Sequence, residues 1–229
     1  MTIRSRDKVL PVQPFFSSLW AGEASYADAV ADAVTAHALE QLPPLAIDGP
    51  EGRTEELASP PALLSFLAML AEMLGAGRIL EVGTFVGVTA MHLAKATGAS
   101  VTTIEASAAF AGIARENIER NGLARVVSVM EGDAADVLDL LYPSFDLVFL
   151  DGAKQSYPDL AGKIEGLLSP GGVIVVDDVF FHGDALNTDP ATGKGRGARA
   201  VIDRYRRRSD FRSSLLPIGN GVLLLRRKA

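Results

Sequence analysis

Cysteine is absent from this 229-residue chain. The absence excludes disulfides, thiolate nucleophiles and zinc–thiolate sites, so any metal must be held by Asp, Glu or one of the three histidines. An excess of positive charge is absent as well, because 28 acidic residues outnumber 22 basic ones and give a formal net charge of −6. An acidic chain lacks the basic face that neutralises phosphates, which disfavours a general nucleic-acid binder.

Long, uninterrupted apolar runs are also lacking, so the sequence predicts no membrane span. Three basic residues near the N-terminus precede a mildly apolar run, but two prolines and a glutamine interrupt that run. This pattern disfavours a signal peptide, and we expect a cytoplasmic protein.

Hydrophobic residues make up 48% of the chain, enough for one sizeable core. We expect an N-terminal arm over residues 1–22 and a single α/β domain over 23–229. Apolar spacing predicts a helix over about 25–42 that a Pro-Pro pair ends, and Ser59-Pro60-Pro61 is typical of the start of another helix.

From Arg78 onward the sequence alternates between strand and helix patterns. The predicted strands are continuous apolar runs, as expected when helices cover both faces of a parallel sheet, and lie near 78–83, 100–105, 125–130, 145–150 and 172–177. Ser169-Pro170-Gly171-Gly172 is expected to form the turn into the fifth strand. Two further apolar runs flank Gly-Asn-Gly near the C-terminus, which predicts a hairpin and a mixed sheet of seven strands.

The stretch ILEVGTFVG, residues 79–87, predicts a strand followed by a tight turn and a helix that starts close to a ligand. A second strand ends on Glu105, where a carboxylate can accept hydrogen bonds from both hydroxyls of a ribose. The glycines Gly83 and Gly87 do not form the Gly-x-Gly-x-x-Gly of dinucleotide enzymes. The motif therefore favours an adenosine ligand without phosphates, such as S-adenosylmethionine.

Further acids follow the third, fourth and fifth predicted strands, namely Asp133, Asp151, Asp177 and Asp178. Carboxyl ends of parallel strands meet at one edge of the sheet, so the last three can supply oxygen ligands to a hard cation such as Mg²⁺. Lys154, one turn after Asp151, is a candidate general base because a nearby cation lowers the pKa of an ammonium group. Each of these residues also has a simpler interpretation. Asp151, which precedes a glycine, can merely form a turn, the pair Asp177-Asp178 can cap a helix, and Lys154 can be a surface lysine.

Other polar residues allow two interpretations each. Glu81 can hold the amino group of the ligand or stabilise a helix N-terminus, and Thr89 can bind a carboxylate or simply begin a helix. Tyr157 is expected to pack against the start of a helix and not to take part in catalysis. Residues 204–208 (RYRRR) are expected on a solvated helix face, and the glycine-rich segment 182–199 is a candidate lid over the acceptor.

Five motifs in this order, EVGTFVG, TTIEAS, EGDA, LDGAKQSY and VVDDVFFHG, resemble the metal-dependent class I O-methyltransferases of the catechol and caffeoyl-CoA type. The resemblance covers about residues 55–229. It implies a Rossmann-like methyltransferase fold with a seven-stranded mixed sheet and a C-terminal antiparallel hairpin. It also implies S-adenosyl-L-methionine as methyl donor, a divalent cation such as Mg²⁺, and a homodimer.

Carried over by position, the resemblance assigns Lys154 as the base. It implies three metal ligands: Asp151, Asp177 and Asp178. The residues it implies around the cofactor are Glu81, Gly83, Phe85, Thr89, Glu105, Asp133, Ala134 and Asp151. Asp178 departs from the family pattern, in which Asn is commoner, and a third carboxylate should tighten metal binding and weaken attraction for an anionic catecholate.

The leading hypothesis is methyl transfer to a hydroxyl of a vicinal dihydroxy or hydroxy-aromatic small molecule. A first alternative is a methyltransferase of the same fold that modifies hydroxyuridine in tRNA, with Arg196, Arg199 and residues 204–208 touching phosphates. Two alternatives come from other classes: an NAD-dependent oxidoreductase, and a non-catalytic adenosine-binding protein.

Overall fold

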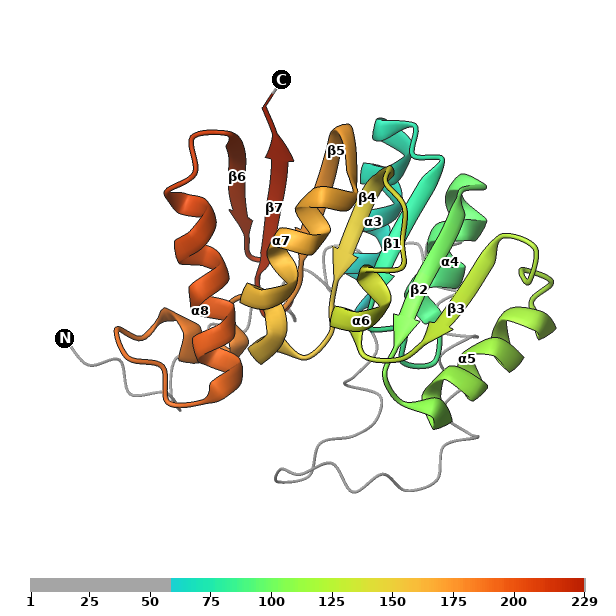
Figure 1. The fold of residues 1–229 in the computed structure, drawn as a ribbon, viewed down its shortest axis with the longest axis horizontal. Helices are drawn as coiled ribbons and strands as arrows, with labels where there is room; N and C mark the ends of the chain where they lie inside the picture. Colours follow the sequence, from blue (N-terminus) through green and yellow to red (C-terminus); the bar gives the residue numbers. More distant parts are fainter. Residues whose placement is uncertain (1–58, 229) are drawn as a thin grey trace, which may run out of the picture. The chain divides into compact units, whose positions relative to one another are not determined.

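The structure is a computed structural model that describes residues 59–228 (Figure 1). The predicted arm over 1–22 and the predicted helix over 25–42 lie outside the described residues. The expected boundary between arm and domain therefore stays a prediction.

Seven strands form one mixed sheet in the order β3-β2-β1-β4-β5-β7-β6, which confirms the predicted fold class. β1 pairs with β2, β2 with β3 and β4 with β5 in parallel, whereas β7 pairs antiparallel with both β5 and β6. The strands are β1 (Arg78–Val82), β2 (Ser100–Glu105), β3 (Val127–Glu131), β4 (Phe145–Leu150), β5 (Leu168–Val176), β6 (Phe211–Leu216) and β7 (Val222–Arg227).

The described chain forms two compact parts, 59–137 and 138–228. The first contains α3 (Pro61–Leu74), α4 (Val88–Thr97) and α5 (Ala108–Arg120), and α6 (Ala134–Leu138) begins at its end. α3 starts as predicted, with proline in its first turn, and ends at Gly75 in the left-handed conformation. α3 and α8 are the longest helices of residues 59–228, with 14 residues each, and no helix in this range has the length and apolar character to span a membrane.

The second part contains η2 (Lys154–Ser156), α7 (Tyr157–Leu167), η3 (Phe181–Leu186) and α8 (Gly193–Arg206), and α7 is in contact with α8 (Figure 1). β5 begins at Leu168, four residues before the predicted start. Phe145 pairs with Leu168, but pairing resumes only at Leu147 and Val173, so residues 169–172 bulge from the strand. The prediction of a turn before the strand was wrong, because the chain already pairs at Leu168.

The segment 182–199, predicted as a glycine-rich lid, is largely ordered secondary structure. Residues 193–199 are the first turns of α8, and the hydroxyl of Thr192 caps this helix by accepting from the N–H of Gly195 at 2.9 Å. The carboxylate of Asp184 accepts from the N–H groups of Ala191 at 2.8 Å and of Thr192 at 3.0 Å, which closes the short loop before α8. The prediction of a loop over 193–199 was therefore wrong.

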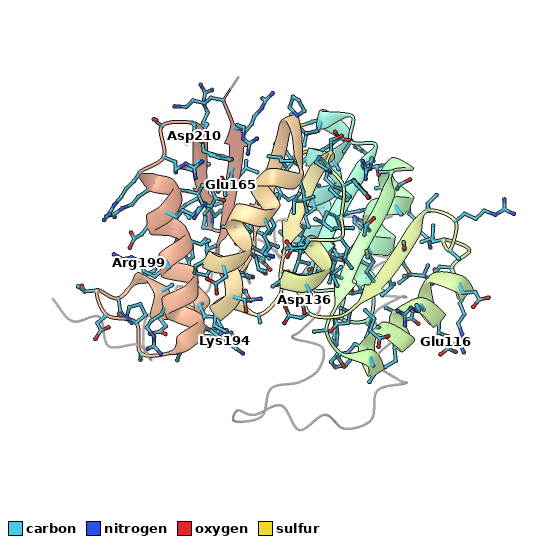
Figure 2. The ribbon with its side chains drawn as sticks, viewed as in Figure 1. Glu116, Asp136, Glu165, Lys194, Arg199 and Asp210 are labelled. Atoms are coloured by element: carbon cyan, nitrogen blue, oxygen red, sulfur yellow. The ribbon has the colours of Figure 1, made fainter. Side chains whose placement is uncertain are left out.

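Glu165 of α7 joins α7 to α8 (Figure 2). Its Oε1 accepts from Arg204 Nη2 at 3.0 Å and from the hydroxyl of Tyr205 at 2.8 Å, and its Oε2 lies 3.2 Å from Arg208 Nη2. The prediction that residues 204–208 lie on a solvated helix face is confirmed for Arg204 and Arg206, which are exposed. It is wrong for Tyr205, which is buried, and for Arg208, which lies beyond the end of α8. A buried carboxylate that binds two guanidinium groups is costly to break, because removing one partner leaves uncompensated charge.

We predict that Glu165→Gln lowers the free energy of unfolding by about 2–3 kcal/mol, since both guanidinium groups lose their counter-charge. The matched control is Glu131→Gln, which breaks an exposed pair with Arg115 and should cost less than about 1 kcal/mol. Urea unfolding followed by far-UV circular dichroism measures both values. Equal losses in the two variants would contradict a structural role for the Glu165 cluster.

Candidate active site

The turn between β1 and α4 has the backbone geometry that the glycine motif predicts. Gly83 has φ 102° and its N–H donates to the carbonyl of Ile104 at 2.9 Å, so the turn is tied to the end of β2. Gly87 has φ 88° and is the N-cap of α4. Left-handed values such as these favour glycine, which explains both glycines of the motif.

The carboxylate of Glu105 at the end of β2 is held by main-chain donors. The N–H of Phe85 donates to its Oε2 at 2.8 Å, and the N–H of Ser107 donates to its Oε1 at 2.9 Å. Each carboxylate oxygen keeps a further lone pair, so two more donors, such as the hydroxyls of a ribose, can bind. The predicted role of Glu105 is thus compatible with its geometry.

Phe85 occupies the left-handed region with φ 50°, which is a strained conformation for a bulky residue. Its ring packs edge-to-face on Phe110, with centroids 4.9 Å apart. The strain places the N–H of Phe85 on Glu105. Phe85 entered the prediction only through the family resemblance, because a phenylalanine with positive φ leaves no local signal in the sequence.

Glu81 is 1% exposed and belongs to a buried chain of hydroxyl groups. Thr103 Oγ1 donates to Glu81 Oε2 at 2.5 Å, and Thr84 Oγ1 lies 2.5 Å from Thr103 Oγ1. A hydroxyl carries one hydrogen, so Thr84 donates to Thr103 when Thr103 donates to Glu81. Sequence reasoning missed both threonines, because a strand threonine that donates to a carboxylate has the same pattern as one that only packs.

The remaining predicted cofactor residues of this part have local partners. Thr89 is buried, and its hydroxyl donates to Ser59 Oγ at 3.0 Å. Asp133 is exposed and its Oδ1 accepts from the N–H of Ala135 at 2.8 Å, so it caps α6 just before Ala134. Their assignment to a cofactor stays a prediction.

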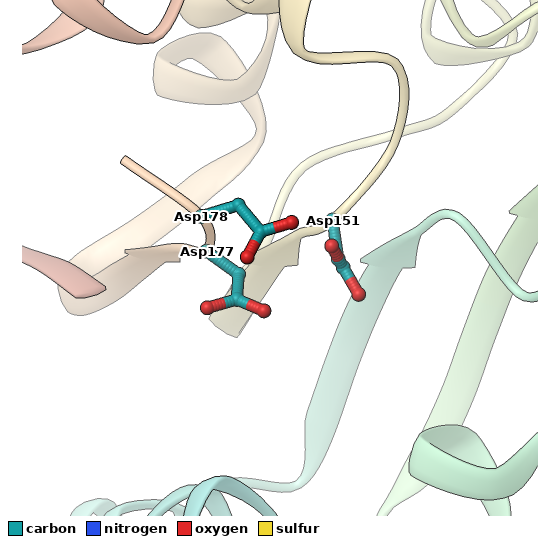
Figure 3. Close-up of side chains that lie close together, drawn as sticks. All are labelled: Asp151, Asp177 and Asp178. Atoms are coloured by element: carbon teal, nitrogen blue, oxygen red, sulfur yellow. The ribbon is translucent and has the colours of Figure 1, made fainter. Parts of the chain in front are cut away.

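Three acids converge where β4 and β5 end, as the sequence predicts for Asp151, Asp177 and Asp178 (Figure 3). One carboxylate oxygen from each lies within 4.8 Å of the other two. Asp177 is 6% exposed, and its Oδ1 is buried with no hydrogen-bond partner among residues 59–228. Lys154 Nζ lies 2.7 Å from Asp151 Oδ1 and 3.0 Å from Asp178 Oδ2.

The charges of this cluster perturb one another strongly. Burial, together with the charges of Asp151 and Asp178, raises the pKa of Asp177 well above its ordinary value. Burial also raises the pKa of Asp151, although the ammonium of Lys154 opposes the change. Burial alone would lower the pKa of Lys154, but the neighbouring carboxylates, Asp151 foremost, raise it above its ordinary value. Within the described part of the chain, the three carboxylates therefore share the charge of Lys154.

Two sets of hydrogen bonds fix the strand ends that carry the acids. The hydroxyl of Tyr157 donates to the carbonyls of Leu150 at 3.3 Å and Asp177 at 3.2 Å, so Tyr157 packs as predicted and also ties β4 to β5. After the acids, the N–H groups of Val179 and Phe180 donate to carbonyls of the turn between β6 and β7. The acids thus stand on a braced part of the chain.

The acid cluster fits a divalent cation. Hard cations bind carboxylate oxygens, and the buried, unpartnered Oδ1 of Asp177 is a group that a positive ion would satisfy. Asp178 has φ 55°, a conformation that Asp and Asn both tolerate, so the unusual Asp is sterically equivalent to the commoner Asn. His182, also at positive φ, is exposed, and it is not part of this metal-ligating group.

A family model described as O-methyltransferase matches residues 31–228, and this match includes both clusters of site residues. This chain belongs to the O-methyltransferase family. The alternatives of an NAD-dependent oxidoreductase and of a non-catalytic adenosine-binding protein were therefore wrong.

Two relatives are identical to the enzyme at about a third of the aligned residues. A catechol O-methyltransferase of Mycobacterium tuberculosis is 35% identical over 161 residues, which cover 69% of this chain and 68% of the relative. A catechol O-methyltransferase of Niastella koreensis is 33% identical over 146 residues, 60% of this chain and 66% of the relative. The chain thus spans about two thirds of the length of these relatives.

A similar solved structure is the O-methyltransferase TomG from Streptomyces achromogenes, which is involved in tomaymycin synthesis and was solved in complex with S-adenosylmethionine. Its TM-score is 0.75 at 29% identity, over 95% of this chain and 96% of that chain. The agreement confirms the methyltransferase fold of the enzyme.

We predict that Asp177→Asn stabilises the metal-free enzyme at neutral pH. The folded-state pKa of Asp177 lies above its unfolded value of 3.8, so above about pH 4 the folded chain binds more protons than the unfolded chain. The contribution of Asp177 to the free energy of unfolding therefore falls as pH rises. Asn cannot ionise, so the variant avoids this loss, which is on the order of 1 kcal/mol or more at neutral pH. Urea unfolding in EDTA at neutral pH and near pH 4 measures the difference.

The control for this prediction is Asp189→Asn, which alters an exposed acid and should change stability at neither pH. A metal-free Asp177→Asn variant that is less stable than the wild type at neutral pH would contradict the prediction, because it would show that the folded chain stabilises the ionised carboxylate of Asp177.

Proposed function

We propose that this O-methyltransferase transfers the methyl group of S-adenosylmethionine to one hydroxyl of a catechol-like small molecule with the help of a divalent cation. The observation that carries the proposal is the cluster of three carboxylates with Lys154 between two of them. Two relatives named catechol O-methyltransferase support the acceptor class.

S-adenosylmethionine is proposed as the methyl donor because the solved relative binds it and because Glu105 is oriented for a ribose. Both oxygens of Glu105 already accept one main-chain hydrogen bond each, which fixes the direction of their remaining lone pairs. A carboxylate that is oriented before the ligand arrives loses little entropy on binding. Glu81, Gly83, Thr89, Asp133 and Ala134 are proposed to complete the contacts, and Asp151 to face both donor and metal.

Asp151, Asp177 and Asp178 would hold the cation, and Mg²⁺ suits three carboxylate oxygens. Lowering the pKa of the reacting hydroxyl and fixing both acceptor oxygens is the chemistry that a bound divalent cation supplies. The ligand set carries three negative charges, so a metal site formed here retains more negative charge than a site with Asn at 178. That charge favours a neutral acceptor over one that arrives as an anion.

Lys154 Nζ is proposed to receive the proton of the reacting hydroxyl. In the metal-free chain the ammonium form is favoured, because Asp151 and Asp178 flank Nζ. Asp151 and Asp178 would share their charge with a bound divalent cation, which would weaken their hold on the ammonium proton of Lys154 and make the neutral amine accessible. The proton acceptor and the metal ligands thus act as one unit.

Methyl transfer itself needs positioning more than it needs further chemical groups. The acceptor oxygen attacks the methyl carbon, the carbon–sulfur bond breaks, and its electron pair stays on sulfur as S-adenosylhomocysteine leaves. An anion and a sulfonium become two neutral groups, so a site that excludes water favours the step.

Three of the arginines that the tRNA alternative needs already have partners within the chain. Arg199 pairs with Asp203 at 3.0 Å, and Arg196 donates to the carbonyls of Pro190 and Ala191. Arg204 is bound to Glu165. Side chains held in this way are poorly placed to meet phosphates, so we favour a small acceptor. The homodimer that the family resemblance implies and the cytoplasmic location remain predictions.

We predict that Glu105→Ala weakens binding of S-adenosylhomocysteine by on the order of 2–4 kcal/mol, because two hydrogen bonds to a charged acceptor are lost. Titration calorimetry measures the change. Glu119→Ala, at an exposed position of α5, is the control and should bind as the wild type does. An unchanged dissociation constant in Glu105→Ala would leave Glu105 as a charge at a strand end.

The decisive experiment incubates the enzyme with methyl-labelled S-adenosylmethionine and a panel of catechols, with Mg²⁺ or with EDTA. Methyl transfer should require the cation. Asp177→Ala should lose nearly all turnover, while its affinity for S-adenosylhomocysteine stays within about twofold of the wild type, since the ribose contacts come from another strand. Asp159→Ala removes an exposed acid of α7 and should keep the wild-type rate. Undiminished transfer in EDTA would contradict the metal site.

A further inference from the structure

Gly197 of α8 lies against the main chain of Lys154. A β-carbon at position 197 would be 2.2 Å from the carbonyl oxygen of Lys154, 2.9 Å from its carbonyl carbon and 2.7 Å from the α-carbon of Gln155. All three neighbours are backbone atoms, so they cannot move aside as the end of a flexible side chain can. Any residue other than glycine at 197 must therefore displace α8 or the turn that carries Lys154.

The glycine at position 197 lowers the stability of the helix that contains it. α8 begins with the sequence Gly-Lys-Gly-Arg-Gly, and a glycine inside a helix costs about 1 kcal/mol relative to alanine. Gly193 at the start of the same helix has open space, with no atom nearer than 4.0 Å to its missing β-carbon. Gly197 is buried, so its lack of a side chain permits the close approach of α8 to η2.

The position of the Lys154 main chain governs the position of its amine. Lys154 opens η2, a single turn of three residues, and its Nζ lies within 3.0 Å of carboxylates on two different strand ends. Its side chain is only 12% exposed, so it has little room to compensate for a shift of its backbone. A displacement at the carbonyl of residue 154 is therefore passed on to Nζ.

We propose that Gly197 is a positioning residue for Lys154: α8 approaches η2 at Gly197 and thereby fixes the main chain from which the amine reaches the acid cluster. The proposal rests on the proposed function in so far as Lys154 receives the proton there. It extends that function to a residue in a different helix that touches neither metal ligands nor cofactor residues by any contact described above.

The test is a double-mutant cycle on kcat with catechol as acceptor. Gly197→Ala should lower kcat between about tenfold and about a hundredfold, because small misplacements of a reacting group cost rates of that order. Its dissociation constant for S-adenosylhomocysteine should stay within about twofold. In a Lys154→Ala background, Gly197→Ala should change kcat less than about twofold, because residues that act as a unit are not additive.

Gly193→Ala is the matched control, since it makes the same change in the same helix with no atom in the way, and it should keep the wild-type kcat. A wild-type kcat in Gly197→Ala overturns the proposal. The proposal is also overturned if Gly197→Ala lowers kcat by the same factor in the Lys154→Ala background, because the glycine then acts only on stability or on another group. A fully active Lys154→Ala variant overturns it as well.

A second measurement does not depend on methyl transfer. The chain has six lysines, so a protein labelled with ¹³C at the lysine ε-carbons gives a simple NMR spectrum, in which the Lys154 signal is the one lost in Lys154→Ala. Gly197→Ala should shift that signal and Gly193→Ala should not. If the wild type methylates no catechol, the proposed function fails, but an unmoved Lys154 signal is what contradicts the positioning role.

Should Gly197→Ala not fold, the variant with Gln155→Gly added supplies the test, because glycine at 155 lets η2 bend around the new methyl group. Its kcat should stay at least about tenfold below that of Gln155→Gly alone. Equal rates in these two variants overturn the proposal.

Discussion

The mutual repulsion of three carboxylates in a partly buried position is the constraint on which the rest of the second part of the chain depends. One carboxylate oxygen each of Asp151, Asp177 and Asp178 lies within 4.8 Å of the other two, and among residues 59–228 Lys154 supplies their ion pairs. Such an arrangement persists only if several independent contacts with the surrounding chain hold it in place. The Tyr157 hydroxyl is bonded to both strand ends, and the N–H groups that follow the acids are bonded to the β6–β7 turn.

Glu165 serves the same end at a distance. Its ion pairs join α7 to α8, and α8 in turn lies against η2, which carries Lys154. In the first part of the chain the cost takes the form of backbone strain, since Phe85 holds a conformation unfavourable for its side chain and thereby orients Glu105. Both parts thus hold candidate site carboxylates in place, the second through ion pairs and the first through a strained backbone.

Much of the fold follows from sequence periodicity. The strands at 78–82, 100–105 and 145–150 agree with the predicted ranges to within one residue, because buried parallel strands are continuous apolar runs. The prediction at 193–199 is wrong because glycine, which is common in loops, here stands in the first turns of a helix. The helical spacing of Ala198, Val201 and Tyr205, all buried, with Thr192 as cap, was the stronger signal.

The site was predictable where it depends on strand ends and not where it depends on contacts between distant elements. Acids that follow parallel strands must gather at one edge of a sheet, so the cluster could be inferred from spacing. No spacing rule connects Thr103 to Glu81, or Gly197 to Lys154, because these contacts exist only once the chain is folded. The bulge at 169–172 could not be predicted for the same reason, because it depends on how β5 pairs with β4.

The Tyr157 hydroxyl has a consequence for ion selectivity. It is bonded to the carbonyl of Leu150, next to Asp151, and to the carbonyl of Asp177, so one phenol oxygen sets the gap between two carboxylate-bearing strand ends. The proposed ligands Asp151 and Asp177 stand on strand ends that these hydrogen bonds join, so they would have little room to spread around a larger ion. Mg²⁺ requires short, nearly octahedral bonds, whereas Ca²⁺ prefers more ligands in a looser shell, so the proposed metal site, with few protein oxygens on two joined strand ends, would favour the smaller ion.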